Sequence, residues 1–206
     1  MFDFIKEIHR KKTIRDLKAA PREKKIDNID EVKSIGVICR LGDEQNWNIL
    51  NHFAKVMENQ GKRVAFMALL EREQDINFVI THQGTHIVRS KSDFNFWGMP
   101  NYEAIRPFVE QHYDLLIDTI GEENFFAQYV ALRTTANLKV VYATPVEDPT
   151  EIFDLIIRGD GPHGRPGRQG DGIDGFAVEL QGDGVVRDGV FQMVKGVHFQ
   201  SNAPRR

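Results

Sequence analysis

Short apolar runs alternate with amphipathic segments through the middle of the chain. Residues 34–40 (SIGVICR) and 62–70 (KRVAFMALL) are apolar stretches typical of strands that are buried on both faces. Between them the apolar residues recur at helical spacing from Trp47 to Met57, and Gly61 ends the predicted helix. These segments therefore predict a strand–helix–strand unit with a right-handed crossover.

The same alternation continues to residue 158. We predict further strands at residues 77–81, 86–89, 113–119, 138–142 and 153–157. A helix follows Asn101, and Pro107 either kinks it or marks its true first turn. The apolar face of another helix consists of Phe125, Tyr129, Leu132 and Ala136. We expect residues 34–158 to form a Rossmann-like three-layer α/β domain with a mostly parallel sheet.

Residues 1–33 form a separate, basic zone. Nine basic and three acidic residues lie between residues 5 and 25, a net charge of +6, so the rest of a chain whose total is −3 carries −9. The basic residues of this arm are Lys6, Arg10, Lys11, Lys12, Arg15, Lys18, Arg22, Lys24 and Lys25. The arm is predicted to be helical up to Ala20, because Pro21 ends the helix. Phe4 and Ile8 share one helix face, and Ile14 and Leu17 share a different one.

This arm has two interpretations. It either docks on an anionic surface, RNA or an acidic membrane, or it is a solvated helix that packs a few apolar groups on the body. Residues 159–206 form a third zone, which holds 11 of the 17 glycines. There we predict a glycine-rich loop and, after Gly175, a β-hairpin; sequence alone does not separate a lineage-specific extension from an aberrant reading frame.

A ligand crevice is expected beyond the carboxyl ends of the parallel strands. The tentative ligand-binding residues there are Arg40, Gly42, Asp43, Asp118, Thr119, Gly121 and Glu122. Their carboxylates would repel a phosphate unless a metal ion intervened. The strand ends also lack the G-x-G of a dinucleotide site and the glycine-rich loop of a nucleotide-triphosphate site.

No set of residues predicts catalysis, a metal or a cofactor. His82 and His86 are four residues apart, but Gly84 between them argues against a zinc-binding helix. The serines lack the setting of a strained nucleophile turn. Cys39 lies within a predicted strand and is expected to be a small buried apolar group. We therefore predict no catalytic residues, no metal ligands and no cofactor.

Three large aromatic residues, Phe94, Phe96 and Trp97, lie in a loop bounded by glycine and proline. This aromatic loop either plugs one edge of the sheet or presents a stacking surface for a base or a protein partner. No apolar run approaches the roughly 18 residues of a transmembrane helix, and the N-terminus lacks a signal-peptide core. We expect a cytoplasmic protein without a transmembrane segment.

Several of these segments resemble a known family. The basic helix, KSIGVI, DFNFWG and YDLLIDTI are similar to uncharacterised α/β proteins of Bacteroidota, a domain of unknown function, over roughly residues 5–158. That resemblance implies the fold and an intracellular location, but no activity. Residues 113–142 are similar, more weakly, to one βαβ unit of heptosyltransferase-type glycosyltransferases, although the chain is too short for both halves of such an enzyme.

Three functional hypotheses follow. The first is a non-catalytic binding or adaptor domain whose basic arm contacts an anionic partner, either RNA or an acidic membrane surface. The alternative is an enzyme or sensor that binds a nucleotide or sugar phosphate in the crevice at the strand ends. The third is a homo-oligomer that associates through the aromatic loop.

Overall fold

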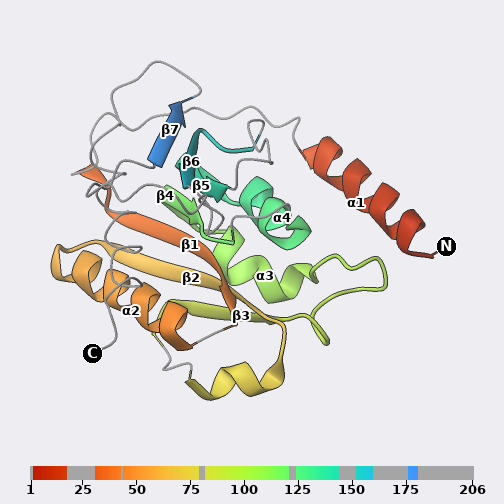
Figure 1. The fold of residues 1–206 in the computed structure, drawn as a ribbon, viewed down its shortest axis with the longest axis horizontal. Coiled ribbons are helices and arrows are strands. Elements are labelled where there is room, and N and C mark those ends of the chain that lie inside the picture. The colour runs from red at the N-terminus through yellow and green to blue at the C-terminus, as the bar shows by residue number, and fades with distance from the viewer. Residues whose placement is uncertain are drawn as a thin grey trace, which may run out of the picture.

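Figure 1 shows the computed structural model of the chain, which describes residues 2–17, 31–42, 44–78, 82–120, 124–143, 152–159 and 176–180. Its helices are α1 (Phe2–Leu17), α2 (Glu44–Asn59), the 3₁₀ helix η2 (Glu73–Phe78), α3 (Tyr102–Val109) and α4 (Phe125–Arg133). Its strands are β1 (Ser34–Leu41), β2 (Arg63–Leu70), β3 (Thr85–Arg89), β4 (His112–Asp118), β5 (Thr135–Ala143), β6 (Leu155–Gly159) and β7 (Phe176–Leu180).

The seven strands form one sheet in the order β3-β2-β1-β4-β5-β6-β7. Strands β1 to β6 are all parallel, and β7 is antiparallel to β6. The chain runs outward from β1 in one direction and from β4 in the other. This arrangement is a three-layer, Rossmann-like α/β fold, and it confirms the predicted fold class.

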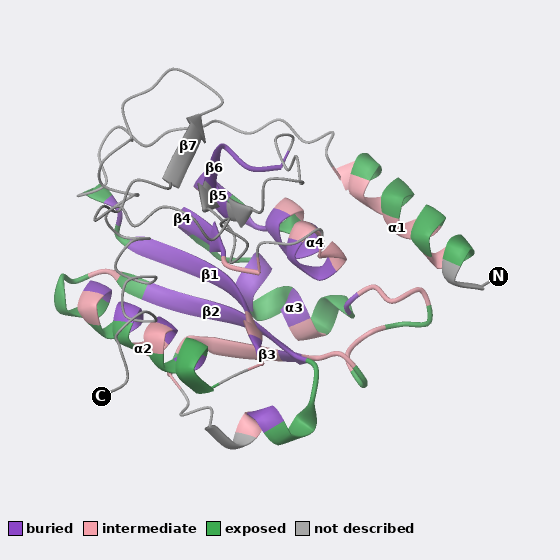
Figure 2. Ribbon diagram, in the orientation of Figure 1, coloured by how far each residue is buried: buried purple, intermediate pink, exposed green. Residues whose placement is uncertain are grey.

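The two faces of the sheet carry separate cores. Alternate side chains of β1, such as Val37 and Cys39, pack with α2, while Ile38 points to the opposite face, where α3 and α4 lie. Figure 2 shows that the central strands β1 and β2 are buried over most of their length, as a parallel sheet covered on both faces requires; the exception in β2 is the exposed Arg63 at its start.

Gly36 allows α3 to approach the sheet closely. A Cβ atom at this position would lie 3.0 Å from Leu116 Cδ1 and from Phe108 Cζ, and 3.1 Å from Tyr113 Cγ. Glycine at this place in β1 is therefore a packing requirement, because the ring of Phe108 occupies the space of a side chain.

Polar anchors hold the amino ends of the central strands together. Asp114 of β4 accepts hydrogen bonds from the backbone N–H groups of Lys33 and Ser34, each at 2.9 Å, and from Ser34 Oγ at 3.0 Å. Its second oxygen accepts one from Asn137 Nδ2 of β5 at 3.2 Å. Partial burial acts to raise the pKa of Asp114, but the hydrogen bonds from Lys33 and Ser34, together with the nearby His112, outweigh it and lower the pKa below its usual value.

Some predicted elements differ from the structure. The strand expected at residues 77–81 is wrong, because Asn77 and Phe78 belong to η2, and residues 79–81 lie outside the described part. Ala136 belongs to β5 rather than to the preceding helix, since α4 ends at Arg133. Pro107 lies in the second half of α3, so it does not mark the first turn.

One boundary also differs in the second half of the chain, and other predicted elements lie outside the described part. The strand predicted at residues 153–157 is β6, which begins at Leu155. Beyond Gly175 the described part contains β7, which pairs with β6. The glycine-rich loop and the second strand of the predicted hairpin lie outside the described residues, as do residues 18–20 of the predicted basic helix.

Candidate functional site

One face of α1 packs against the body of the molecule. Ile14 and Leu17, which share one helix face, pack on the core formed with α3 and α4. The ring of His9 stacks on Trp97 of the aromatic loop, with centroids 4.9 Å apart and planes 10° apart. Thr13 Oγ1 lies 3.6 Å from Met99 Sδ. The helix is thus attached to α4 and to a loop more than 80 residues away.

The side chain of Arg10 is held in a defined position where α1 meets the aromatic loop. Its Nε donates a hydrogen bond to the carbonyl oxygen of Trp97 at 3.3 Å, and its guanidinium lies 5.4 Å from the ring centroid of Phe125. Gly98, which has a φ of +71°, leaves the space for it, because a Cβ atom there would lie 2.0 Å from Arg10 Nη2. Gly98 is therefore needed both for its left-handed backbone and for the position of Arg10.

The three aromatic residues of the loop have three different environments. Phe94 is half-buried, and its ring centroid lies 5.9 Å from that of Phe126 of α4, as expected of a plug. Trp97 holds α1 through His9. Phe96 remains 66% exposed, and Lys6 Nζ lies 5.0 Å from its ring centroid. The loop is thus partly a plug, partly a support for α1 and partly an exposed surface.

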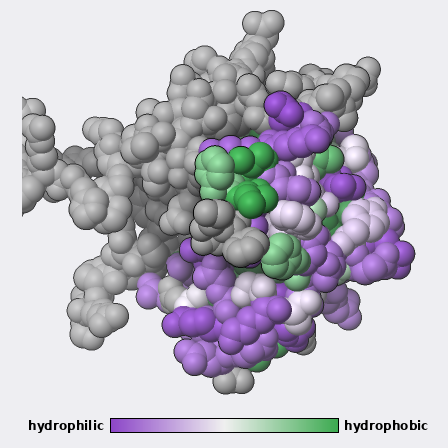
Figure 3. Space-filling model, turned by 90° about the vertical axis from the view of Figure 1, so that its right-hand side faces the viewer, coloured by the Kyte–Doolittle hydropathy of each residue, from purple (hydrophilic) through white to green (hydrophobic). Residues whose placement is uncertain are grey.

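The outer face of α1 is apolar near its start and basic farther along. Phe4, Ile5 and Ile8 are 71%, 45% and 53% exposed, and they are three of the five large apolar residues that the described part exposes. The exposed basic residues are Lys11, Lys12 and Arg15. Figure 3 views the side of the molecule on which α1 lies and shows an apolar patch bordered by hydrophilic atoms. The remaining arm residues, Lys18, Arg22, Lys24 and Lys25, lie outside the described part.

A cleft of about 870 Å³ lies between α1 and the carboxyl end of the sheet. The residues that line it come from α1, the ends of β2 and β3, the aromatic loop and the start of α4. They are Lys6, Glu7, Arg10, Lys11, Ile14, Arg15, Leu69, Ser90, Lys91, Phe94, Asn95, Phe96, Gly98, Asn124, Phe125, Phe126, Gln128 and Ile152. Two residue sets that the sequence analysis treated separately, the basic arm and the aromatic loop, therefore meet in one cleft.

The described part of the cleft lining is positively charged. Among the described lining residues five are basic and one, Glu7, is acidic. Glu7 lies 3.4 Å from Lys11 in an exposed pair. The sequence analysis expected an acidic crevice at the strand ends, but it did not include α1, which brings four of the five basic side chains. The fifth, Lys91, follows β3 and is exposed.

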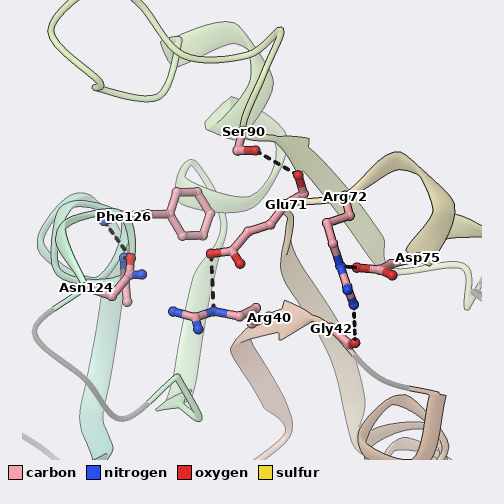
Figure 4. A network of polar contacts seen from close by, with 9 residues as sticks. Arg40, Gly42, Glu71, Arg72, Asp75, Ser90, Asn124 and Phe126 are labelled. Atoms are coloured by element: carbon pink, nitrogen blue, oxygen red, sulfur yellow. Dashed lines mark hydrogen bonds and ion pairs between the residues drawn. The ribbon is translucent and has the colours of Figure 1, made fainter.

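Those predicted crevice residues that the structure describes do not line this cleft, and they serve local structure. Figure 4 shows Arg40 directed at Glu71, with Nε 3.5 Å from Oε1. The carbonyl oxygen of Gly42 accepts a hydrogen bond from Arg72 Nη2 at 3.1 Å. Asp118 is buried and accepts from the N–H of Ile120, and Thr119 Oγ1 donates to the carbonyl oxygen of Ile38. Asp43, Gly121 and Glu122 lie outside the described residues.

Asn124, which the sequence analysis missed, caps α4 at the rim of the cleft. Its Oδ1 accepts hydrogen bonds from the backbone N–H groups of Phe126 at 2.9 Å and Ala127 at 3.3 Å. An asparagine directly before a helical apolar run is a recognisable N-cap signal. Because the cap already satisfies these N–H groups, the anion-attracting part of the cleft is its basic side chains rather than the end of α4.

The remaining reactive side chains lie apart from the cleft. Burial, with a smaller contribution from the charge of Asp118, raises the pKa of Cys39 to about 12, so its thiol is not a nucleophile in the folded chain. His82 Nε2 lies 2.6 Å from Glu58 Oε1, and burial lowers the pKa of His86, which contacts Phe108. Within the described ranges no three His, Cys, Asp or Glu residues are grouped as a metal site.

None of the helices in these described ranges combines the length and the apolar character needed to cross a bilayer.

Comparison with known proteins gives a family but no activity. Residues 6–161 match a family described as "Family of unknown function (DUF6913)", and the match ends close to the start of the glycine-rich zone. No curated protein and no solved structure matches the chain. The expected resemblance to an uncharacterised family is thereby confirmed. Because the match covers about three quarters of its residues, the chain belongs to the family of unknown function DUF6913.

Proposed function

We propose that this chain is a binding domain that docks on an anionic membrane surface through the outer face of α1. The observation that carries the proposal is the combination of exposed apolar and basic residues on that face. Phe4, Ile8, Lys11 and Arg15 follow one another at spacings of four, three and four residues, so they form a single stripe along the helix. Phe4 and Ile8 are more than half exposed.

The inner face of α1 supports this interpretation. His9, Thr13 and Leu17 contact the body, which fixes the orientation of the helix and leaves Phe4 and Ile8 on the outside. An interfacial helix buries such apolar residues at the boundary between headgroups and acyl chains, while its cations remain at headgroup level. Each basic residue near an anionic leaflet contributes about 1 kcal/mol.

The pairs that neutralise part of this charge are weak. Lys11 lies 3.4 Å from Glu7, and Arg15 lies 3.9 Å from Asp16, but all four side chains are at least half exposed. Exposed pairs of this kind contribute little and exchange readily with other anions. Among the described residues, no carboxylate pairs with Lys12 and would compete with a lipid headgroup. We therefore expect Lys11, Lys12 and Arg15 to contact headgroup phosphates, in the cytoplasm, where the facing leaflet is anionic.

RNA is the less favoured partner. Non-specific RNA binding uses cations for the phosphates and aromatic faces for the bases. The two isoleucines of the outer face, Ile5 and Ile8, offer neither, and they would remain in water in an RNA complex. A lipid surface, in contrast, uses both the apolar and the basic residues of the stripe.

Co-sedimentation with vesicles tests the proposal. The full chain is mixed with vesicles of phosphatidylcholine alone or with vesicles that also contain phosphatidylserine. In a separate experiment its binding to a single-stranded RNA oligomer is measured. We expect binding that requires phosphatidylserine, weakens with salt, falls about fivefold in Lys12→Ala and is lost in the double variant Phe4→Ser/Ile8→Ser. Lys55→Ala on α2 and Tyr102→Ala on α3, both exposed and remote from the stripe, are the matched controls.

Three results would overturn the proposal. The first is equal vesicle binding by wild type and the Phe4→Ser/Ile8→Ser variant. The second is RNA binding that depends on Lys12 but not on Phe4 and Ile8, which assigns the arm to RNA. The third is a doubled mass in solution that Ile8→Ser restores to the monomer value, which assigns the patch to a second copy of the chain.

A further inference from the structure

We infer that the cleft beneath α1 binds a small molecule that carries a phosphate group on a flat ring, in the class of nucleoside phosphates. The cleft shares Lys11 and Arg15 with the outer stripe of α1 but is not lined by Phe4 or Ile8, and it lies on the α3 and α4 side of the sheet. It does not include Gly42 or the start of α2, where a glycine-rich dinucleotide loop would lie.

The first argument is charge. Within the described part of the chain, five basic side chains surround the cleft and one carboxylate, that of Glu7, lies among them. A hollow lined by charges of one sign between apolar walls concentrates the potential and raises the local concentration of counter-ions. Arg10 is already placed by the carbonyl oxygen of Trp97 and the ring of Phe125, so little side-chain entropy is lost when it contacts an anion.

The second argument is the apolar part of the lining. Four phenylalanines, Phe94, Phe96, Phe125 and Phe126, line the cleft together with Leu69 and Ile152. A site for inorganic phosphate or a sugar phosphate alone would have no use for them. A flat ring can contact their faces while its phosphate reaches the basic side of α1, and base-to-aromatic contacts contribute about 1 to 3 kcal/mol each.

The third argument is size and polarity. A volume of about 870 Å³ lies within the range of small-molecule sites, and polar side chains of Ser90, Asn95 and Gln128 stand among the apolar ones. Ser90 Oγ donates to the carbonyl oxygen of Glu71 at 3.3 Å, which keeps it at the carboxyl end of β2 as Figure 4 shows. These groups can orient the ligand without any change in the fold.

Isothermal titration calorimetry on the full chain tests the inference with four probes: the nucleoside monophosphates, ribose 5-phosphate, pyrophosphate and unphosphorylated nucleosides. We expect at least one nucleoside monophosphate to bind at least tenfold more tightly than the other three probe types, and more weakly as salt increases. Comparable binding of ribose 5-phosphate or pyrophosphate would overturn the role of the ring. Comparable binding of a nucleoside would overturn the role of the phosphate, and no binding of any probe would overturn the whole inference.

Two variants keep this result separate from that of the membrane proposal. Lys91→Ala removes a basic residue that lines the cleft but lies outside α1, so we expect a tenfold loss of nucleotide affinity and unchanged vesicle binding. Lys12→Ala, which does not line the cleft, should show the reverse pattern. Because both residues are exposed, neither variant should disturb folding. Unchanged nucleotide affinity in Lys91→Ala would contradict the assignment of this cleft.

Discussion

The imidazole of His9 lies parallel to the indole of Trp97, with a ring-centroid distance of 4.9 Å and an interplanar angle of 10°. This pair joins the first helix to a loop 88 positions farther along the chain, and Arg10 adds a hydrogen bond to the carbonyl oxygen of the same tryptophan. Both proposals depend on this junction, because it orients the outer face of α1 and forms one wall of the cleft.

Replacing Trp97 with alanine should detach α1. The stacked pair contributes about 0.5 to 1.5 kcal/mol beyond its buried area, so we expect hydrogen exchange in residues 2–17 to become roughly tenfold faster. Exchange in β1 and β4 should be unchanged, because neither strand contacts Trp97. Tyr102→Ala on α3 is the control for loss of an aromatic ring. Unchanged protection of residues 2–17 would show that the stack is dispensable.

Replacing Gly36 with valine should destabilise the fold. Leu116 and Phe108 already stand 3.0 Å from the place of a Cβ atom, so the larger side chain forces α3 away from the sheet. We expect the free energy of unfolding to fall by about 1 to 3 kcal/mol in urea denaturation. Gly42→Ala is the matched control: its Cβ would meet nothing within 4 Å, and we expect a change within about 0.5 kcal/mol. Equal stability of the two variants would contradict the packing argument.

The thiol of Cys39 should be inert until the chain unfolds. Burial raises its pKa to about 12, so almost no thiolate exists at pH 8. With a disulfide reagent such as dithionitrobenzoate, we expect no labelling of the native protein and one equivalent in urea, because the chain has a single cysteine. Prompt labelling without denaturant would show that β1 is more accessible than the structure indicates.

Stability should depend on Asp114 above its folded-state pKa and not below it. The hydrogen bonds that it accepts from Lys33 and Ser34 lower that pKa, so the ionised form stabilises the fold at pH values above the unfolded-state value of about 4. This contribution is lost as the pH falls through the lower, folded-state value. Asp114→Asn should therefore be less stable than wild type by about 1 kcal/mol at pH 6.

Urea midpoints for both proteins from pH 6 down to the acid range measure this effect. The difference between wild type and Asp114→Asn should shrink as the carboxylate becomes protonated. A difference that stays constant over the whole range would mean that the hydrogen bonds act through shape alone, without any contribution from the charge.

The sequence predicted the central strands because their burial leaves a strong pattern. The run from Ser34 to Arg40 is apolar on both faces, and it forms β1. For shorter segments the sequence pattern distinguished helix from strand less clearly. Ala136 fits the spacing of the preceding helix, yet Thr135 and Ala136 pair with β4, because forming sheet hydrogen bonds overrides a weak helical pattern.

The candidate site was predictable only in parts. The basic residues of the arm and the aromatic residues of the loop each stood out in the sequence. The contact between these two sets could not be predicted, because Arg10 and Trp97 are 87 residues apart and no local pattern encodes such a contact. For the same reason the positive charge of the cleft was not predicted: it depends on α1, which approaches the sheet only through tertiary packing.

The position of β3 as an edge strand of the sheet affects the tendency of the protein to aggregate. Edge strands present unpaired backbone N–H and C=O groups, with which a strand of another molecule can pair. Long apolar edge strands therefore promote fibril growth. Here the border is five residues long, only Val88 among them is buried, and Arg89 lies 3.6 Å from Glu73 in an ion pair. A short edge strand with a charged end, such as β3, discourages aggregation at the high concentrations that calorimetry demands.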